Sequence, residues 1–401
     1  MLTTNPMTAL ERRVVATLAL LYSFRMLGLF MALPILALYA VDMLGASPLM
    51  IGLALGAYGA TQALLQIPLG WLSDRVGRKP VIMGGLAMFV LGSVVAALAD
   101  SVPMIAFGRA LQGAGAISGS VMALAADLTS EEQRTKAMAV IGISIGLSFA
   151  LALICGPLLA AWGGLQAVFW MTAALALLGM AIVALGIPTA AARSHEGVGA
   201  NRNMFRPVLA DPVLQRLNGS VFLLHFMLTA SFLVVPTVIE GTMGVPRDSH
   251  WQVYLPVLAF SLLGMYPFLR LSEKGGRPGL ALKITVLMMP ASLAALFLGK
   301  DTVLLYAGLC GFFTAVNYLE AALPSLVSKA VFAHGKGTAL GVYATCQFLG
   351  AFVGGTTGGF LYGSAGLSGL LYLVLIAAAL WLMLIWRMAP EGDASRAASS
   401  V

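Results

Sequence analysis

Long apolar stretches, separated by short polar ones, run along the whole chain. Twelve of these stretches are long enough to cross about 30 Å of hydrocarbon as a helix. The runs are unbroken and do not alternate at every second residue, so they predict helices and not the strands of a barrel. The expected spans lie at roughly 13–40, 49–72, 81–99, 103–127, 137–162, 165–187, 215–240, 251–271, 280–299, 302–327, 338–362 and 368–388.

The polar stretch between the second and third spans, GWLSDRVGRKP at residues 70–80, carries more charge than a connection of this length needs. We call it the charged turn. Gly77 lets the chain reverse, and Pro80 suits the first turn of the next helix. Alternating charges in so tight a turn predict a fixed salt-bridge cluster; a basic loop that only sets membrane orientation is the alternative. The residues expected to take part are Gly70, Asp74, Arg75, Gly77, Arg78 and Lys79.

Part of the charged turn repeats in the second half of the chain. The string LSDRVGR at 72–78 returns as LSEKGGR at 271–277, an offset of 199 residues. Such repetition predicts two copies of one membrane unit. We therefore expect an all-α integral membrane protein with twelve transmembrane helices in two six-helix halves. The expected boundaries are 1–187 for the first half, 188–214 for a cytoplasmic linker, 215–390 for the second half and 391–401 for a short tail.

Composition supports a membrane protein. Of 401 residues, 60% are hydrophobic and only 10% are charged, whereas soluble domains carry about 25% charged residues. The net charge of +7 does not indicate nucleic-acid binding, because nearly all cations fall in loops on one side of the predicted spans. By the positive-inside rule, both termini are then cytoplasmic.

Two smaller features concern the cysteines and the start of the chain. Cys155, Cys310 and Cys346 lie inside apolar runs without metal-type spacing, so we expect buried thiols and neither a disulfide nor a metal site. The first apolar stretch is too long for a cleavable signal. Thr8 and Glu11, just before it, have the spacing of a capping box.

Charged and titratable residues inside the spans are few, and such residues are usually paired or functional. Glu320 lies in the tenth span among apolar neighbours, where we expect it to be out of reach of water. A carboxyl group in such surroundings favours its neutral form, as a proton carrier requires. His225 in the seventh span falls at a comparable depth and titrates near physiological pH. The pair is expected to load and release a proton; a static hydrogen bond of Glu320 with His225 or Asn317 is the alternative.

A second group of polar residues is expected to line a cavity between the halves. Arg25 stands near the middle of the first span, where it would either bind an anionic group of a substrate or pair with a distant carboxylate. Gln62 and Gln66 lie one turn apart and face the same way. The expected cavity residues are Arg25, Tyr58, Gln62, Gln66, Asn317, Tyr343 and Gln347.

Three sequence motifs resemble signatures of the major facilitator superfamily. The charged turn fits G-x-L-[AS]-D-R-x-G-R-[KR] at every fixed position, and residues 109–115 fit R-x-x-Q-G-x-G. The third signature, typical of efflux members, is degraded at 152–161, where Gly156 and Pro157 remain but two glycines are replaced by alanine. Longer strings, among them SFRMLGLFMALPIL at 23–36 and NYLEAALPSLVSK at 317–329, resemble the YajR-type bacterial branch of the drug:proton antiporter group.

The resemblance implies roles for several residues. Asp74 would cap the N-terminus of the eleventh span, near 337–341, in the outward-open state. Arg78 would pair with Asp127 at the end of the fourth span, and both contacts would lock the cytoplasmic side and break as the halves rock. Arg109 would link protonation to conformational change; a structural bond to backbone carbonyls is the alternative.

The expected function is that of a proton-coupled antiporter, not an enzyme, that exports small amphipathic compounds or drugs by alternating access. A symporter or facilitator for a specific metabolite or sugar is the alternative, favoured by the lack of an acidic residue deep in the first half. A receptor that does not transport would require Arg25, Arg109 and Glu320 to be inert. We expect no cofactor besides the proton gradient, a small-molecule substrate, a monomer, and a place in the bacterial inner membrane. YajR-type proteins can carry a soluble domain after the last span, and this chain is expected to lack it.

Overall fold

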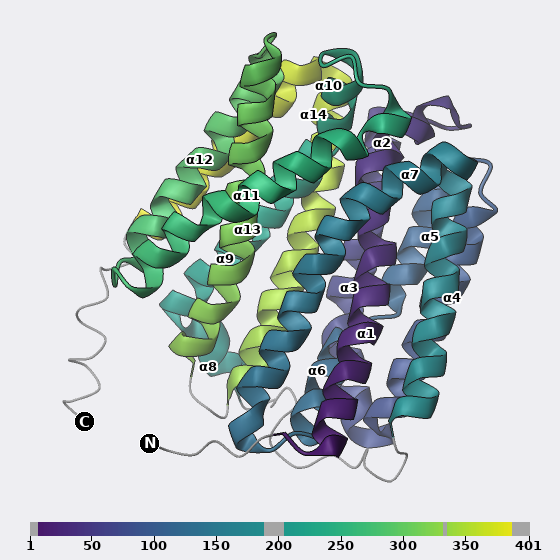
Figure 1. Ribbon diagram of the computed structural model, residues 1–401, viewed down its shortest axis with the longest axis vertical. Coiled ribbons are helices and arrows are strands. Elements are labelled where there is room, and N and C mark those ends of the chain that lie inside the picture. Colours follow the sequence, from purple (N-terminus) through teal and green to yellow (C-terminus); the bar gives the residue numbers. More distant parts are fainter. Residues whose placement is uncertain (1–6, 188–203, 332–334, 387–401) are drawn as a thin grey trace.

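The computed structural model describes residues 7–187, 204–331 and 335–386, and these are almost entirely helical (Figure 1). The first half contains α1 (Ala9–Met31), α2 (Leu33–Tyr39), η1 (Ala40–Asp42), α3 (Pro48–Val76), α4 (Arg78–Ala97), α5 (Val102–Ala114), α6 (Ser118–Asp127) and α7 (Glu131–Gly186). The second contains α8 (Phe205–Ala210), α9 (Pro212–Ser231), α10 (Val235–Gly241), η4 (Arg247–Ser249), α11 (Trp251–Glu273), α12 (Pro278–Leu298), α13 (Thr302–Ala330) and α14 (Lys336–Trp386).

Within the described ranges, nine helical stretches are long and apolar enough to cross a membrane. Two of these contain two spans each, because α7 turns at Gly163 and Gly164, and α14 turns at Gly366. A further span is divided between α5 and α6, neither of which is long enough alone. The arrangement is consistent with twelve spans.

The fourth span is broken, although the sequence predicts one continuous helix at 103–127. Residues 115–117 separate α5 from α6. Gly115 lies against the backbone of Gly85 so closely that a Cβ at residue 115 would overlap the Gly85 carbonyl oxygen. The break leaves backbone groups without helical partners in the middle of the bundle, and such groups must be satisfied by other parts of the protein.

The repeat predicted from the charged turn is visible in the backbone. Described glycines with positive φ fall into three pairs, each with one member in either half. Gly77 and Gly276, the turn glycines of the two copies, are 199 residues apart and have φ of 97° and 58°. The other pairs are Gly45 with Gly244 and Gly164 with Gly366. Only glycine adopts such φ values at little cost, so the two halves use the same turns at the same places.

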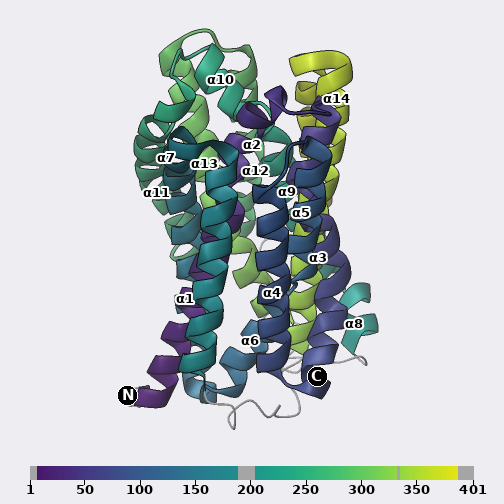
Figure 2. The ribbon, with the colours of Figure 1, turned by 90° about the vertical axis from the view of Figure 1, so that its right-hand side faces the viewer.

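The two halves contact each other mainly toward one end of the bundle. We call this end, which holds α10, η1 and η4, the α10 end, and the opposite end, which holds α8 and the α3–α4 turn, the α8 end (Figure 2). Near the α10 end, α3 and α14 approach so closely that a Cβ on Gly52 would overlap the carbonyl of Gly355. Toward the α8 end, a Cβ on Gly70 or Gly341 would meet nothing within 4 Å. The α10 end is therefore closed, and α3 and α14 separate toward the α8 end.

The linker and the ends of the chain can be followed only in part. Most of the expected linker lies at 188–203, and the expected tail at 391–401, both outside the described residues. The later part of the linker region contains α8, and Asp211 then caps α9 by accepting hydrogen bonds from the Val213 and Leu214 amides. At the start of the chain, the capping box of Thr8 and Glu11 is confirmed.

Candidate functional site

His225 and Glu320 lie together between α9 and α13, as the sequence predicts from their depths. The imidazole Nε2 of His225 is 3.0 Å from the carboxyl Oε1 of Glu320. On its other side the ring places Nδ1 3.2 Å from the carbonyl oxygen of Val221. A carbonyl oxygen only accepts hydrogen bonds, so Nδ1 carries a proton and the ring orientation is fixed.

This orientation bears on how the pair could share a proton. With Nδ1 protonated, a neutral imidazole presents a lone pair at Nε2, and an ionised carboxylate also presents only lone pairs. Two acceptors do not attract each other at 3.0 Å, so a direct hydrogen bond between Nε2 and Oε1 needs a proton on one of the two groups. The amide nitrogen of Gln347, a donor, lies 2.8 Å from the same Nε2 and competes with Glu320 for it. We call His225 and Glu320 the proton pair.

The surroundings of Glu320 differ from the prediction in two respects. Its side chain is 37% exposed, so it is not enclosed by apolar neighbours in this conformation, as the sequence predicts it to be. The alternative partner predicted for Glu320, Asn317, bonds elsewhere: its amide donates to Ser261 Oγ at 2.9 Å.

Arg25 does not line an open cavity in this conformation. Its side chain is only 1% exposed and donates to four neutral acceptors. The guanidinium group contacts Ser118 Oγ at 3.1 Å, Tyr58 Oη at 2.7 Å, Gln62 Oε1 at 2.8 Å and the freed carbonyl of Gly115 at 3.2 Å. Arg25 thus satisfies the backbone where the fourth span is broken. Its contact with a substrate stays a prediction.

The other predicted cavity residues are divided between the two halves. In the first half, Gln62 donates to Gln66 at 2.9 Å, and both are buried beside Arg25. In the second half, Gln347 and Asn317 are half-buried, and Tyr343 is buried with a hydroxyl that has no hydrogen-bond partner among the described residues. The sequence predicts that these residues line one cavity. In this conformation they form a buried hydrogen-bonded network in the first half and a partly exposed set of side chains in the second.

Arg109 is also buried, at 2% exposure, and its described hydrogen bonds go to backbone carbonyls. It donates to Ala54 O at 3.2 Å and to Leu55 O at 3.3 Å. This is the geometry of the structural alternative; a role in linking protonation to conformational change stays a prediction. The guanidinium carbon lies 5.7 Å from the ring centroid of Tyr58, and that of Arg25 lies 5.9 Å from the same ring. We call Arg25 and Arg109 around Tyr58 the positive centre.

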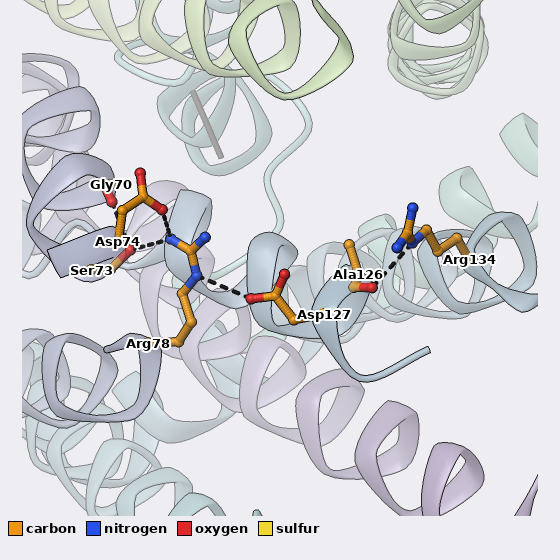
Figure 3. A network of polar contacts seen from close by, with 7 residues as sticks. All are labelled: Gly70, Ser73, Asp74, Arg78, Ala126, Asp127 and Arg134. Atoms are coloured by element: carbon orange, nitrogen blue, oxygen red, sulfur yellow. Dashed lines mark hydrogen bonds and ion pairs between the residues drawn. The ribbon is translucent and has the colours of Figure 1, made fainter. Parts of the chain in front are cut away.

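The charged turn forms the predicted salt-bridge cluster, centred on Arg78 (Figure 3). Arg78 pairs with Asp74 and with Asp127, the latter at 3.3 Å, and donates to Ser73 Oγ at 2.7 Å. Ser73 in turn donates to the carbonyl of Gly70 at 2.7 Å. The pair of Arg78 with Asp127 is thus present as predicted, but both residues belong to the first half. Since the pair persists while α3 and α14 are apart at the α8 end, it does not itself lock one half to the other.

The remaining residues of the charged turn have different partners. Lys79 Nζ donates to the carbonyls of Ala184 and Ile187 at 3.0 and 2.6 Å, so it caps the C-terminal end of α7. Arg75 is exposed. The carboxylate of Asp74 contacts Arg78, and its predicted contact with the N-terminus of α14 stays a prediction for the conformation in which the α8 end closes.

A contact between the halves at the α10 end was not predicted. Arg247 donates to Glu240 Oε1 at 2.9 Å and reaches across to the carbonyl of Leu38 in the first half at 3.3 Å. Its guanidinium carbon also lies 5.3 Å from the ring centroid of Tyr39. We call this contact the α10 latch. The only signal in the sequence is that Arg247 is one of few cations on its side of the predicted spans.

Comparisons with known proteins agree with this architecture. Residues 18–355 match the family described as Major Facilitator Superfamily. The chain therefore belongs to the Major Facilitator Superfamily and is a membrane-spanning transporter, not an enzyme. It is 43% identical over 378 residues to the inner membrane transport protein YajR of Escherichia coli (strain K12), covering 94% of this chain and 83% of that protein. It is also 29% identical over 350 residues to the multidrug resistance protein MdtH of Edwardsiella ictaluri (strain 93-146), covering 84% of this chain and 83% of that one.

Solved structures show the same fold. A bacterial homologue of the human lysosomal transporter Spinster, in an inward-facing and unoccupied conformation, superposes with a TM-score of 0.75 at 15% identity, covering 95% of this chain and 98% of that one. The human organic anion transporter MFSD10 superposes with a TM-score of 0.68 at 19% identity, covering 94% and 99%.

Proposed function

We propose that this transporter exports small amphipathic compounds in exchange for protons. The observation that carries the proposal is the proton pair: His225 Nε2 lies 3.0 Å from Glu320 Oε1, a distance suited to sharing one proton, and the Glu320 side chain is 37% exposed. A group that holds a proton in the bundle interior and also contacts water is able to exchange that proton when the conformation changes.

The cycle that follows is alternating access. Proton loading on the pair neutralises the Glu320 carboxylate and favours one arrangement of the halves, while substrate binding between the halves favours release of the proton. A ligand shifts such an equilibrium only by its different affinity for the two states. The conformation found here supplies one of the two states: α3 and α14 touch near the α10 end and are apart toward the α8 end. The proposed second state closes α3 against α14 at the α8 end.

The relatives support the direction and the location of transport. MdtH is named a multidrug resistance protein and YajR an inner membrane transport protein. We place this chain in the bacterial inner membrane as a monomer, with both termini in the cytoplasm, because its cations lie predominantly in loops on the side of the termini. The α8 end then faces the cytoplasm, and the conformation described here is open toward it.

The alternative is a symporter or facilitator for a specific metabolite. The network of Arg25, Gln62 and Gln66 favours it, because several polar groups fixed by mutual hydrogen bonds are suited to recognise one polar substrate. Proton coupling through Glu320 is common to the antiporter and the symporter, and absent from the facilitator.

The test is substrate-triggered proton movement in proteoliposomes. Wild type is compared with Glu320→Gln and with Glu240→Gln, which removes a carboxylate of the α10 latch outside the proton pair. We expect proton flux opposite to substrate flux in the wild type and in Glu240→Gln, and none in Glu320→Gln. Proton and substrate fluxes in the same direction would identify a symporter. Substrate flux that ignores the pH gradient in every variant would identify a facilitator and make Glu320 structural.

A further inference from the structure

The interior of the first half contains two arginines, Arg25 and Arg109, that have no carboxylate among their described hydrogen-bond partners. Arg25 and Arg109 are each at least 98% buried, and both guanidinium carbons lie within 6 Å of the Tyr58 ring centroid. Among the described residues, the hydrogen-bond acceptors of both arginines are hydroxyl, amide or backbone oxygens, all of them neutral. Buried charges are usually compensated by an opposite charge, so the positive centre is unusual.

Hydrogen-bonding capacity in the positive centre is also left over. Arg25 Nε and Arg109 Nη1 are buried and have no hydrogen-bond partner among the described residues, and the same holds for the hydroxyl of Ser120. Ser120 lies in the first turn of α6, which begins in the middle of the bundle at the break of the fourth span and has no side-chain cap. The N-terminal end of a helix carries a partial positive charge and free amides, which favour an anion.

The positive centre lies beside the interface between the halves. The ring of Phe348 in α14 packs against the Tyr58 ring with centroids 5.8 Å apart. The residue before it, Gln347, contacts His225 of the proton pair. A substrate between the halves near this part of α14 is therefore close to both sites.

We infer that the transported compound is an organic anion, whose carboxylate or sulfonate group is drawn to the positive centre. This inference rests on the proposed function, since it names the substrate class of the same transport pathway. When substrate binds, its anionic group replaces Tyr58 or Gln62 as an acceptor of Arg25. A charged acceptor forms a stronger bond with a guanidinium group than a neutral one does, so the exchange favours binding. Cations of the same shape are repelled.

The experiment uses the full chain purified in detergent and a set of three naphthalene derivatives. They carry a sulfonate group, a neutral hydroxymethyl group or a trimethylammonium group on the same ring system. Binding is measured by calorimetry and by the shift of the thermal unfolding midpoint. The variants are Arg25→Gln, Arg25→Lys and, as a matched control, Arg12→Gln, which removes an exposed arginine from the start of the same helix.

We expect the wild type and Arg12→Gln to bind the sulfonate at least tenfold more tightly than the trimethylammonium compound. Arg25→Gln should lose at least tenfold in affinity for the sulfonate and little for the neutral compound. Arg25→Lys keeps the charge and should retain part of the preference, which separates loss of charge from loss of folding. A sulfonate that binds the wild type no better than the neutral or cationic compound overturns the inference.

Failure of this inference and failure of the proposed function give different results. A preference for the sulfonate without coupled proton movement in proteoliposomes supports the inference and contradicts proton exchange. Coupled proton movement with a preference for the trimethylammonium compound supports proton exchange and contradicts the inference of an anionic substrate.

Discussion

The ring of Phe348 in the second half packs edge-on against the ring of Tyr58 in the first, with centroids 5.8 Å apart. Tyr58 also contacts Arg25, and the residue before Phe348 contacts His225. The positive centre and the proton pair, which belong to different halves, are thus joined through two consecutive residues of α14. A movement of α14 along α3 necessarily changes the surroundings of both.

Our first prediction concerns the number of protons that the pair holds. If His225 and Glu320 share one proton, the variants His225→Gln and Glu320→Gln disrupt the same event. His225→Gln should then lose as much proton-coupled transport as Glu320→Gln, and the double variant no more than either, as is usual for residues that act as a unit. The measurement is initial proton flux in proteoliposomes at equal protein density. Substantial proton flux retained in His225→Gln would show that the two residues act separately.

The second prediction concerns the buried ion pair of the charged turn. Arg78→Ala leaves the carboxylate of Asp127, which is 1% exposed, without this partner. Unpairing a buried charge costs about 3 kcal/mol, and we expect a correspondingly lower thermal unfolding midpoint in detergent. The double variant Arg78→Ala with Asp127→Asn should recover part of the loss. The control is Arg75→Ala, which removes an exposed arginine of the same turn and should have little effect.

The third prediction uses the close approach of α3 and α14. Gly52→Ala places a Cβ against the carbonyl of Gly355, and overpacking of this kind costs about 1–3 kcal/mol in the conformation with the α10 end closed. We expect the equilibrium to shift toward opening of that end. The measurement is maleimide labelling of Thr237→Cys, at a cavity of about 270 Å³ between the halves, in a background without native cysteines.

The control for this prediction is Gly70→Ala, since nothing lies within 4 Å of a Cβ at that position. It should not raise the labelling rate at the α10 end. An unchanged rate in Gly52→Ala, together with normal folding, would mean that α3 and α14 adjust without separating.

The fourth prediction concerns the α10 latch. Arg247 and Glu240 are about one-third exposed, and pairs of this kind contribute less than about 1 kcal/mol. Arg247→Ala should therefore raise labelling of Thr237→Cys only a few-fold and leave the unfolding midpoint nearly unchanged. Lys300→Ala removes another cation from the same side of the predicted spans and should have no effect on labelling. A large loss of stability in Arg247→Ala would indicate that it has a structural role besides closing this end.

The sequence predicts the helical architecture well, because a span needs only length and hydrophobicity. It also predicts the repeat, since the turn glycines Gly77 and Gly276 require a backbone conformation that other residues rarely adopt. The proximity of His225 and Glu320 follows from counting turns along two antiparallel helices. These features are local, or depend only on depth in the membrane.

The features that the sequence does not predict depend on contacts between distant segments. The break at 115–117 arises from the approach of Gly115 to Gly85, and its freed carbonyl finds Arg25 on another helix. The exposed fraction of Glu320 depends on how α9, α13 and α14 pack around it, and a pattern along the chain does not specify that packing.

The uncompensated guanidinium groups of Arg25 and Arg109 have a consequence for the energy source of transport. If one organic anion leaves for each proton that enters, both movements carry positive charge in the same direction across the membrane. Each cycle then moves two elementary charges, and a potential of 100 mV contributes about 2.3 kcal/mol for each of them. Export of a monovalent cation by the same one-to-one exchange would move no net charge. The missing carboxylate beside Arg25 would thus make the membrane voltage, as well as the pH difference, a driving force for export.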